Sequence, residues 1–320
     1  MAETDANHDP LPPLPTRRAD GHKGTFGTVS VIGGCVVGGS AEPGKVMLGA
    51  PAMAARAALR AGAGLVSAII PSPLVIPLLT LLPEATAAGL AVDGENRVVP
   101  HEAAAVLDTA LDNASACALG PGLGGGHEAE AMTQRVLGQD RVPVIVDADA
   151  LNALARIDRF TELVRAPAVL TPHPGEFGRL AERLGMTPTG ERATDAETLA
   201  QRVGAVIVLK GAGTVVTDGL RTWTCRRGHP CLAVGGTGDV LTGLIAGLAA
   251  QFVAPGPRAI GSVELPRPPG KPLDLFDAAR LGVEAHALAG ERWATEHDAS
   301  GGLLARELAD LLPVVLQNLR

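Results

Sequence analysis

The chain alternates two kinds of segment. Short runs such as 142–146 and 205–209 are apolar at almost every position, which is typical of parallel strands buried on both faces. Longer segments repeat apolar residues every three or four positions, which predicts amphipathic helices. The predicted strands are 29–33, 65–70, 114–119, 142–146, 168–170 and 205–209. The predicted helices are 50–63, 102–111, 128–137, 175–184, 194–202, 239–251, 275–296 and 303–317.

This order of elements predicts the architecture. Because helices separate most of the strands, the fold class is α/β, with a largely parallel sheet covered by helices on both faces. Segments 214–217 and 221–224, joined through Asp218-Gly219, predict a hairpin. Residues 1–18 are polar and rich in proline, which predicts a flexible N-terminal arm without a secretory signal. Residues 19–320 are predicted to form one domain, in which 254–272, rich in proline and glycine, is a loop insertion.

Composition narrows the class of function. Apolar residues make up 46% of the 320 residues and aromatic residues only 2%, so we expect a core of alanine, valine and leucine. The net charge of −7 argues against nucleic-acid binding, which needs a basic surface, although one cleft can still be locally positive. No apolar run is long enough to cross a membrane. The cysteines lack the spacing of a metal site, and we expect free thiols in a cytoplasmic protein. They are Cys35, Cys117, Cys225 and Cys231.

The most informative segment is Gly235-Gly236-Thr237-Gly238-Asp239, at the start of a predicted helix. Glycines let the backbone approach a ligand closely, and the free N–H groups of a helix start favour phosphate. We predict an anion hole made of Gly236, Thr237 and Gly238. A phosphate would repel the Asp239 carboxylate, so its simplest role is to take a proton from a hydroxyl that attacks phosphorus. An isolated aspartate here could instead be a partner of the helix dipole.

Four further polar segments follow predicted strands, and the carboxyl ends of parallel strands meet at one edge of a sheet. They are Gly120-Pro121-Gly122-Leu123-Gly124, Asp147-Ala148-Asp149 with Asn152, Thr171-Pro172-His173-Pro174-Gly175-Glu176, and Lys210-Gly211-Ala212-Gly213-Thr214. Each has a structural alternative: a flexible turn, ordinary helix-start carboxylates, a surface histidine or a tight turn. The chain has neither a P-loop nor a dinucleotide fingerprint. Together the segments predict a cleft suited to phosphoryl transfer.

Taken in order, these segments resemble a known family. Other matching segments are His22-Lys23-Gly24-Thr25-Phe26-Gly27, Val31-Ile32-Gly33-Gly34, Gly49-Ala50-Pro51 and Ala58-Leu59-Arg60-Ala61-Gly62-Ala63-Gly64. From about Arg18 onward, the chain is similar to the ADP-dependent NAD(P)H-hydrate dehydratases, also called the carbohydrate-kinase domain of the YjeF type. The combination of Thr-Pro-His-Pro-Gly-Glu with Gly-Gly-Thr-Gly-Asp is the most specific part of the match. The resemblance implies a ribokinase-like fold and the single-function form, without the epimerase domain that some relatives carry.

The resemblance also implies a metabolite-repair activity on the S epimer of hydrated NADH or NADPH. ADP or ATP, with Mg²⁺ between the phosphates, would phosphorylate the C6 hydroxyl, and loss of phosphate would restore NAD(P)H. Asp239 would be the catalytic base. Substrate contacts would come from Ala50, Gly122, His173 and Asp239. Nucleotide contacts would come from Lys210, Gly211, Ala212, Gly213, Thr214 and Gly238. Glu176 or Asp147 could orient the metal through water.

Relatives of this kind are usually homotetramers, and a single-function form would act with a separate epimerase. Two segments depart from the family pattern: 35–48 is longer, and Gly228-His229-Pro230-Cys231 stands where relatives often have Gly-Asn-Pro-Gly. Two alternative functions stay open, a ribokinase-like kinase of a small hydroxymethyl compound such as a vitamin precursor, and a catalytically silent nucleotide-binding or assembly protein. The Thr-Pro-His-Pro-Gly-Glu segment favours the dehydratase over the kinase, and the retained Asp239 argues against a silent protein.

Overall fold

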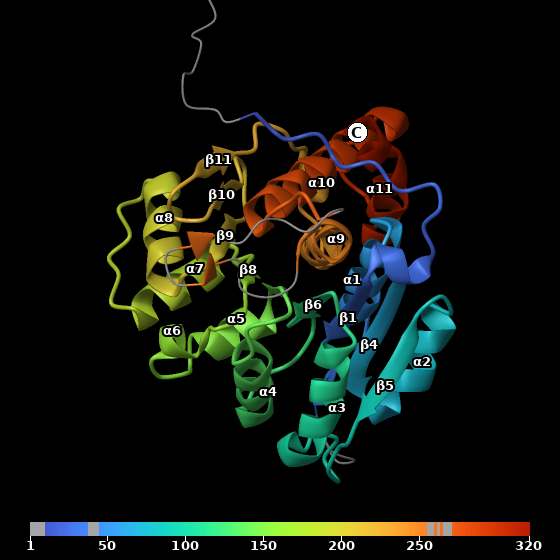
Figure 1. Ribbon diagram of the computed structural model, residues 1–320, viewed down its shortest axis with the longest axis vertical. Helices are drawn as coiled ribbons and strands as arrows, with labels where there is room; N and C mark the ends of the chain where they lie inside the picture. Colours follow the sequence, from blue (N-terminus) through green and yellow to red (C-terminus); the bar gives the residue numbers. More distant parts are fainter. Residues whose placement is uncertain (1–9, 38–44, 255–258, 261–262, 265–270) are drawn as a thin grey trace, which may run out of the picture.

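The computed structural model describes residues 10–37, 45–254, 259–260, 263–264 and 271–320. Its centre is a nine-stranded sheet with the strand order β11-β10-β9-β8-β7-β6-β1-β4-β5 (Figure 1). All neighbouring strands are parallel except the β9–β10 and β10–β11 pairs. The strands are β1 (Thr28–Ile32), β4 (Leu65–Pro71), β5 (Thr86–Leu90), β6 (Ala116–Leu119), β7 (Val144–Val146), β8 (Ala168–Leu170), β9 (Val206–Leu209), β10 (Val215–Thr217) and β11 (Thr222–Thr224).

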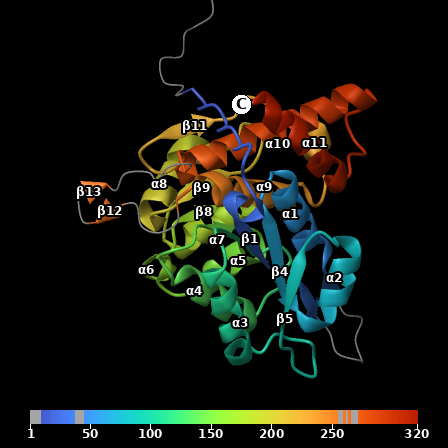
Figure 2. The same ribbon diagram turned by 45° about the vertical axis from the view of Figure 1, so that its right-hand side comes forward.

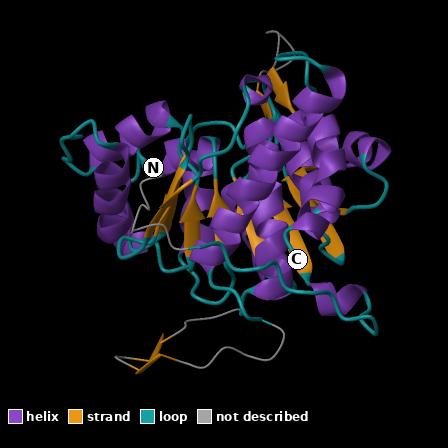
Figure 3. Cartoon of the chain, turned by 90° about the horizontal axis from the view of Figure 1, so that it is seen from above, coloured by secondary structure: helices purple, strands orange, loops and turns teal. Residues whose placement is uncertain are grey.

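Helices cover both faces of this sheet, as Figure 3 shows from above. One face packs against α1 (Gly49–Arg60), α9 (Thr237–Phe252), α10 (Leu275–His297) and α11 (Ala305–Asn318). The opposite face packs against α3 (Pro100–Asp112), α4 (His127–Leu137), α5 (Asp149–Leu154), α6 (Phe160–Leu163), α7 (Pro174–Arg183) and α8 (Arg192–Val203). Along β6, Ala116 and Ala118 join the first core and Cys117 and Leu119 join the second. The predicted α/β fold class is therefore confirmed.

Several elements lie outside the prediction. The structure adds α2 (Val75–Leu81), a hairpin of β2 (Cys35–Val37) and β3 (Lys45–Met47), and the edge strand β5. Of the predicted insertion at 254–272, the larger part lies outside the described residues; β12 (Ala259–Ile260) and β13 (Val263–Glu264) form an antiparallel pair there (Figure 2). Among the described helices, none combines the length and the apolar character needed to span a bilayer.

The predicted N-terminal arm is packed from residue 10 onward, whereas residues 1–9 lie outside the described part. Leu14 is only 2% exposed, and its N–H donates to the carbonyl oxygen of Leu319 at 2.6 Å. Arg17 donates to the carbonyl oxygen of Gly62 at 2.7 Å, and Arg320 donates to that of Pro15 at 2.8 Å. The structure thus differs from a freely flexible arm over residues 10–18, which run beside the C-terminal end of the chain (Figure 1).

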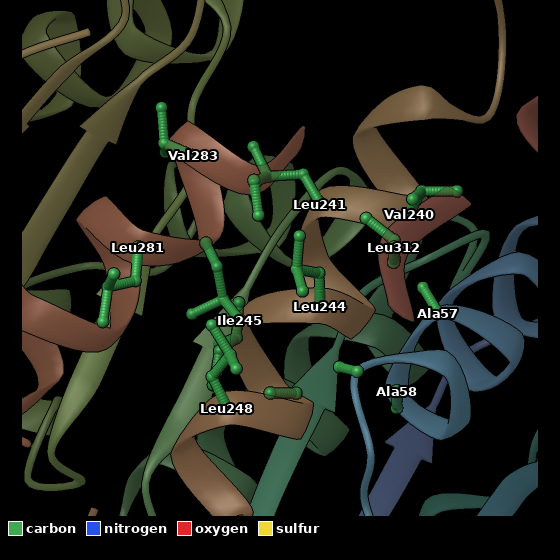
Figure 4. Packing of buried hydrophobic residues seen from close by; sticks show 14 of the residues in the cluster. Ala57, Ala58, Val240, Leu241, Leu244, Ile245, Leu248, Leu281, Val283 and Leu312 are labelled. Atoms are coloured by element: carbon green, nitrogen blue, oxygen red, sulfur yellow. The ribbon is translucent and has the colours of Figure 1, made fainter. Parts of the chain in front are cut away.

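Helix α9 forms the centre of the first core. Its side chains interlock with those of α1, α10 and α11, as Figure 4 shows around Leu244 and Ile245. A Cβ placed on Gly243 would lie 1.9 Å from the carbonyl oxygen of Ala54, so the backbones of α9 and α1 are in direct contact. Of the sixteen residues of α9, only Gly238 and Asp239 are not buried. Gly238 and Asp239 are therefore the half-buried start of an otherwise enclosed helix.

Candidate active site

The sheet reverses its winding direction between β1 and β6. From β1 the chain continues to β4 and β5 on one side, and then crosses to β6, β7, β8 and β9 on the other. Ligands of open α/β sheets bind at such a switch point, beyond the carboxyl ends of the strands. Here the loops after β1 and β6 touch, because the N–H of Gly34 donates to the carbonyl oxygen of Pro121 at 3.0 Å.

The switch point brings two predicted substrate residues together. A Cβ placed on Gly122 would lie 3.3 Å from the Cβ of Ala50, in the first turn of α1, and 3.0 Å from that of Met47. Gly122 also has a φ of +62°, which favours glycine. The Gly120–Gly124 segment is therefore a closely packed loop that lines the cleft. Ala50 and Gly122, two of the predicted substrate contacts, lie next to each other there.

Asp147 is the buried centre of the site, with 2% of its surface exposed. Lys210 donates to its Oδ1 at 2.6 Å, and the Thr171 hydroxyl donates to the same oxygen at 2.8 Å. The hydroxyl of Thr242, on α9, donates to Oδ2 at 2.7 Å. This carboxylate at the end of β7 thus joins the ends of β8 and β9 to the N-terminal part of α9, and it holds the Lys210 ammonium in place.

The helix start at α9 has the geometry of an anion site. Gly236 is the N-cap residue with a φ of +93°, and Thr237, Gly238 and Asp239 form the first turn. The Thr237 hydroxyl donates to the carbonyl oxygens of Leu232 and Val234, both at 2.9 Å, so it shapes the preceding loop. A Cβ placed on Gly238 would lie 3.7 Å from the Lys210 Nζ. The backbone N–H groups of the helix and the Lys210 ammonium therefore face the same space.

The carboxyl group of Asp239 faces this space, and its pKa is raised. Burial, together with the neighbouring Asp147, raises the pKa of Asp239 to about 7, although Lys210 opposes this shift. Burial alone would lower the pKa of Lys210, but the charges of Asp147 and Glu176 outweigh it and raise that pKa. The site consequently holds a permanent cation beside a carboxyl group that titrates near neutrality, which is the acidity expected of a general base.

His173 and Glu176 form a capping box at the start of α7. The Nδ1 of His173 accepts from the N–H groups of Gly175 and Glu176, and the His173 N–H donates to the Glu176 carboxylate at 2.8 Å. Burial raises the pKa of Glu176 to about 7, and burial and the Lys210 charge lower the pKa of His173. His173 is exposed, so it presents a neutral imidazole to the cleft with its proton on Nε2.

The predicted nucleotide residues lie after β9. Gly211 has a φ of +148° and Gly213 one of +66°, and the Thr214 hydroxyl donates to the carbonyl oxygen of Gly211 at 2.9 Å. Arg192 on α8 holds the base of this loop, because it donates to the carbonyl oxygens of Leu209 and Lys210. Lys210 and Gly238 therefore lie close together. The loop through Ala212 to Thr214 follows Lys210 directly in the chain.

The two weak metal candidates differ in their free oxygens. Both Asp147 oxygens already accept hydrogen bonds from protein groups. Glu176 is 4% exposed, and its Oε2 accepts from the His173 N–H at 2.8 Å, whereas in the described part of the chain its Oε1 accepts no hydrogen bond. Within the described residues, no cluster of three or more histidine, cysteine, aspartate or glutamate side chains could hold a metal by itself.

The two departures from the family pattern lie beside the site. Gly228 donates to Glu291 at 2.9 Å and the Cys231 thiol donates to the carbonyl oxygen of Gly290 at 3.3 Å, so this segment is attached to α10. The four cysteines are free thiols, as predicted. Of the longer 35–48 loop, residues 38–44 lie outside the described part. Cys35 approaches the Gly124 loop, where a Cβ would lie 3.1 Å from the thiol sulfur.

The sequence interpretation gave no role to three residues that shape the site, although one of them, Thr171, lies in a predicted cleft segment. Thr171 and Thr242 hold Asp147, and His286 on α10 donates from Nε2 to the carbonyl oxygen of Thr237 at 2.9 Å. Burial lowers the pKa of His286 to about 4, so the ring is neutral. The available signal was weak: a histidine in the middle of an alanine-rich helix, and a threonine three positions after Asp239. Asp149, by contrast, lies in the first turn of α5 as predicted, where it accepts from the N–H of Gly124.

The fold and this site define a ribokinase-like protein. A solved ribokinase-like superfamily protein from Enterococcus faecalis V583 is 25% identical, with a TM-score of 0.73, over 96% of this chain and 92% of that chain. Residues 34–314 match the profile of the NAD(P)H-hydrate dehydratase family. The chain therefore belongs to the NAD(P)H-hydrate dehydratase family.

Individual relatives agree with this assignment. The ADP-dependent (S)-NAD(P)H-hydrate dehydratase of Xanthomonas campestris is 33% identical over 89% of this chain and 88% of its own. The bifunctional NAD(P)H-hydrate repair enzyme Nnr of Moorella thermoacetica is 37% identical over 96% of this chain but only 52% of its own, so the chain spans about half of that relative. The ADP/ATP-dependent NAD(P)H-hydrate dehydratase of Bacillus subtilis, co-crystallised with ATP/Mg²⁺, has a TM-score of 0.70 and 31% identity, over 96% of this chain and 95% of that chain.

Proposed function

We propose that this protein dehydrates the S epimer of hydrated NADH or NADPH in a reaction that consumes ADP or ATP. The observation that carries the proposal is Asp239, a carboxyl group with a pKa of about 7 on the partly buried first turn of α9, opposite Lys210. Membership of the NAD(P)H-hydrate dehydratase family supports the choice of substrate.

The proposed reaction has two steps. Asp239 takes the proton of the C6 hydroxyl, whose oxygen attacks the terminal phosphorus of the nucleotide, and the bond from that phosphorus to the nucleotide breaks. The electron pair of the ring nitrogen then expels phosphate from C6, and loss of a proton from C5 restores the double bond of NAD(P)H. Phosphorylation is needed because hydroxide is a much poorer leaving group than phosphate.

Different residues stabilise the phosphoryl group, contact the substrate and bind the nucleotide. The N–H groups of Gly236, Thr237 and Gly238 and the Lys210 ammonium stabilise the charge on the transferring phosphoryl group. Ala50 and Gly122 contact the hydrated ring, and the neutral imidazole of His173 contacts the substrate from the opposite loop. Gly211, Ala212, Gly213 and Thr214 bind the adenine nucleotide together with Gly238.

Mg²⁺ fits this arrangement as an ion held mainly by the nucleotide. Mg²⁺ keeps several waters and is commonly bound by phosphates with one or two carboxylates. Glu176 is the better water-mediated contact of the two candidates, because both oxygens of Asp147 are occupied by protein donors. When bound, the ion would neutralise charge on the phosphates.

The decisive experiment supplies the purified protein with chemically hydrated NADH or NADPH, Mg²⁺ and either ADP or ATP. We expect the absorbance band of the dihydronicotinamide to recover only when a nucleotide is present, with release of free phosphate. Asp239→Asn should lower the rate by about 10²- to 10⁴-fold, because the general base is lost.

The matched control is Asp108→Asn, an exposed aspartate on α3 that pairs with Arg135. Its rate should equal that of the wild type. Absence of recovery with either nucleotide, in folded protein, rejects the proposed function. A stable phosphorylated product in place of free phosphate would identify the alternative, a kinase of a small alcohol.

The proposed function also includes a location, an oligomeric state and a partner enzyme. We propose a cytoplasmic homotetramer that receives the S epimer from a separate epimerase. The repair enzymes Nnr among the relatives are bifunctional and about twice as long as the matched region, which supports a pairing of two activities.

A further inference from the structure

A groove lies beside the site, between the loop after β6 and helices α5 and α7. Its volume is about 790 Å³, which is within the range of roughly 300–1,000 Å³ found for pockets that bind small molecules. Helices α5 and α7 lie next to each other in both Figure 1 and Figure 2. The polar residues that line the groove are Asp149, Asn152, Arg156, Arg179, Glu182 and Arg183.

The groove continues from the candidate active site at two points. Gly124, which lines it, is two residues from Gly122 at the switch point. On the other side, a Cβ placed on Gly175 would lie 2.9 Å from the His173 ring and 3.8 Å from the Nη1 of Arg179. The residues that line the groove are therefore direct neighbours of both Gly122 and His173, the two predicted substrate contacts.

The three arginines of the groove differ in their partners. Arg156 forms an ion pair with Glu130 at 3.1 Å, and Arg183 forms one with Asp158. Within the described ranges, the one side-chain hydrogen bond of Arg179 runs from its Nε to the neutral Asn152 at 2.9 Å. In the part of the chain that the structure describes, no carboxylate lies within ion-pair distance of Arg179, and its side chain is exposed. A guanidinium in this state presents its remaining N–H donors to a ligand.

Two carboxylates also line the groove. Asp149 accepts from the Gly124 N–H at 2.9 Å and is thus engaged in holding the loop. Glu182 follows Arg179 by three residues on the same helix and is exposed, so its charge would weaken the binding of an anion there.

We propose that this groove binds a phosphate group in the adenosine half of the hydrated dinucleotide, with Arg179 as its main contact. The inference rests on the proposed function, because the hydrated ring must lie at Asp239 and the rest of the substrate must leave the cleft. Both the pyrophosphate and the 2′-phosphate offer the planar oxygen pairs that guanidinium binds. Arg179 is then a residue that sets affinity for the substrate and not the rate of the chemical step.

The test compares Arg179→Gln with the wild type on hydrated NADH and on hydrated NADPH. We expect KM to rise about 10-fold or more with kcat unchanged, since a charge-assisted contact is lost in the ground state and the transition state equally. Arg179→Lys should recover part of the affinity. Glu182→Gln should lower KM for the same substrate. Arg141→Gln, on the distant pair with Asp112, is the control and should change neither constant.

The pattern of KM values identifies the phosphate. A rise for both substrates assigns the pyrophosphate to the groove, and a rise for hydrated NADPH alone assigns the 2′-phosphate and makes Arg179 a specificity residue. Unchanged KM values for both substrates overturn the inference, as does a fall in kcat without a change in KM. If the wild type itself is inactive, the proposed function fails first. Fluorescence titration with NADPH and NADH then tests the groove independently, and equal dissociation constants for wild type and Arg179→Gln reject it.

Discussion

Asp147 and Asp239 are carboxylates beside the same ammonium group, yet their surroundings give them different tasks. Asp147 accepts hydrogen bonds from Lys210, Thr171 and Thr242, so both of its oxygens are engaged by protein donors. Among the residues that the structure describes, no comparable set of donors surrounds Asp239, and burial raises the pKa of Asp239 to about 7. Asp147 therefore positions Lys210, and Asp239 is the group able to accept a proton.

This difference predicts the pH dependence of the reaction. Asp239 must be ionised to accept the C6 proton, and a raised pKa means that it is largely protonated below about 7. We expect kcat/KM to increase about tenfold per pH unit in the acidic range and to level off above about 7. Initial rates over a pH series, with a substrate that does not titrate in this range, provide the measurement. A profile that is flat through neutrality would contradict the assignment of Asp239 as the base.

Some helices and strands could be predicted from the sequence, and others could not. The buried parallel strands and the long helices were predicted within a few residues, because continuous apolar runs and helical periodicity are strong signals. Strand β5 was missed because its sequence Thr-Ala-Ala-Gly-Leu has low strand propensity, and pairing with β4 stabilises it instead. Helix α2 was missed because it is short, contains proline and has no polar face.

The grouping of the candidate site residues was predictable from the topology of a parallel sheet. Its loops follow strands whose ends meet by topology, so Lys210, Asp147 and Asp239 could be grouped from the sequence alone. The hydrogen bonds of Thr242 and His286 depend on how α9 and α10 pack, which periodicity does not specify. The Arg179 groove likewise depends on the contact between α5 and α7.

Two glycines of α9 should respond in opposite ways to alanine. A Cβ on Gly243 would lie 1.9 Å from the Ala54 carbonyl oxygen, so Gly243→Ala must separate α1 from α9 and should cost about 3 kcal/mol or more. A Cβ on Gly238 meets nothing closer than 3.7 Å and gains helix propensity, so Gly238→Ala should keep its melting temperature.

The same Gly238→Ala methyl group enters the space opposite Lys210, and the KM for the nucleotide should rise about tenfold. Thermal melting and nucleotide-dependent kinetics of the two variants separate these effects. A Gly238→Ala protein that melts early, or one that binds nucleotide normally, would contradict the proposed anion hole.

Residues 14 and 15 are hydrogen-bonded to the last two residues of the chain. Leu14 is buried against the first core, and its backbone is joined to Leu319. Leu14→Ala should lower the free energy of unfolding by about 2–5 kcal/mol, because it leaves a cavity. The KM values should stay unchanged, since Leu14 belongs to the core cluster and not to the residues of the site. Chemical denaturation gives the energy, and a loss below about 0.5 kcal/mol would show that the 10–18 segment does not contribute to the fold.

The enclosure of α9 sets a limit on how the anion hole can open. Beyond Asp239, every residue of this helix is buried against α1, α10 or the sheet. Backbone amides in such a helix exchange with solvent hydrogen only when the core itself opens. The buried part of α9, which supports Gly236 and Thr237, is therefore displaced only when the core of the domain opens. Any mutation that loosens the core far from the cleft also raises the fraction of molecules in which the hole does not exist.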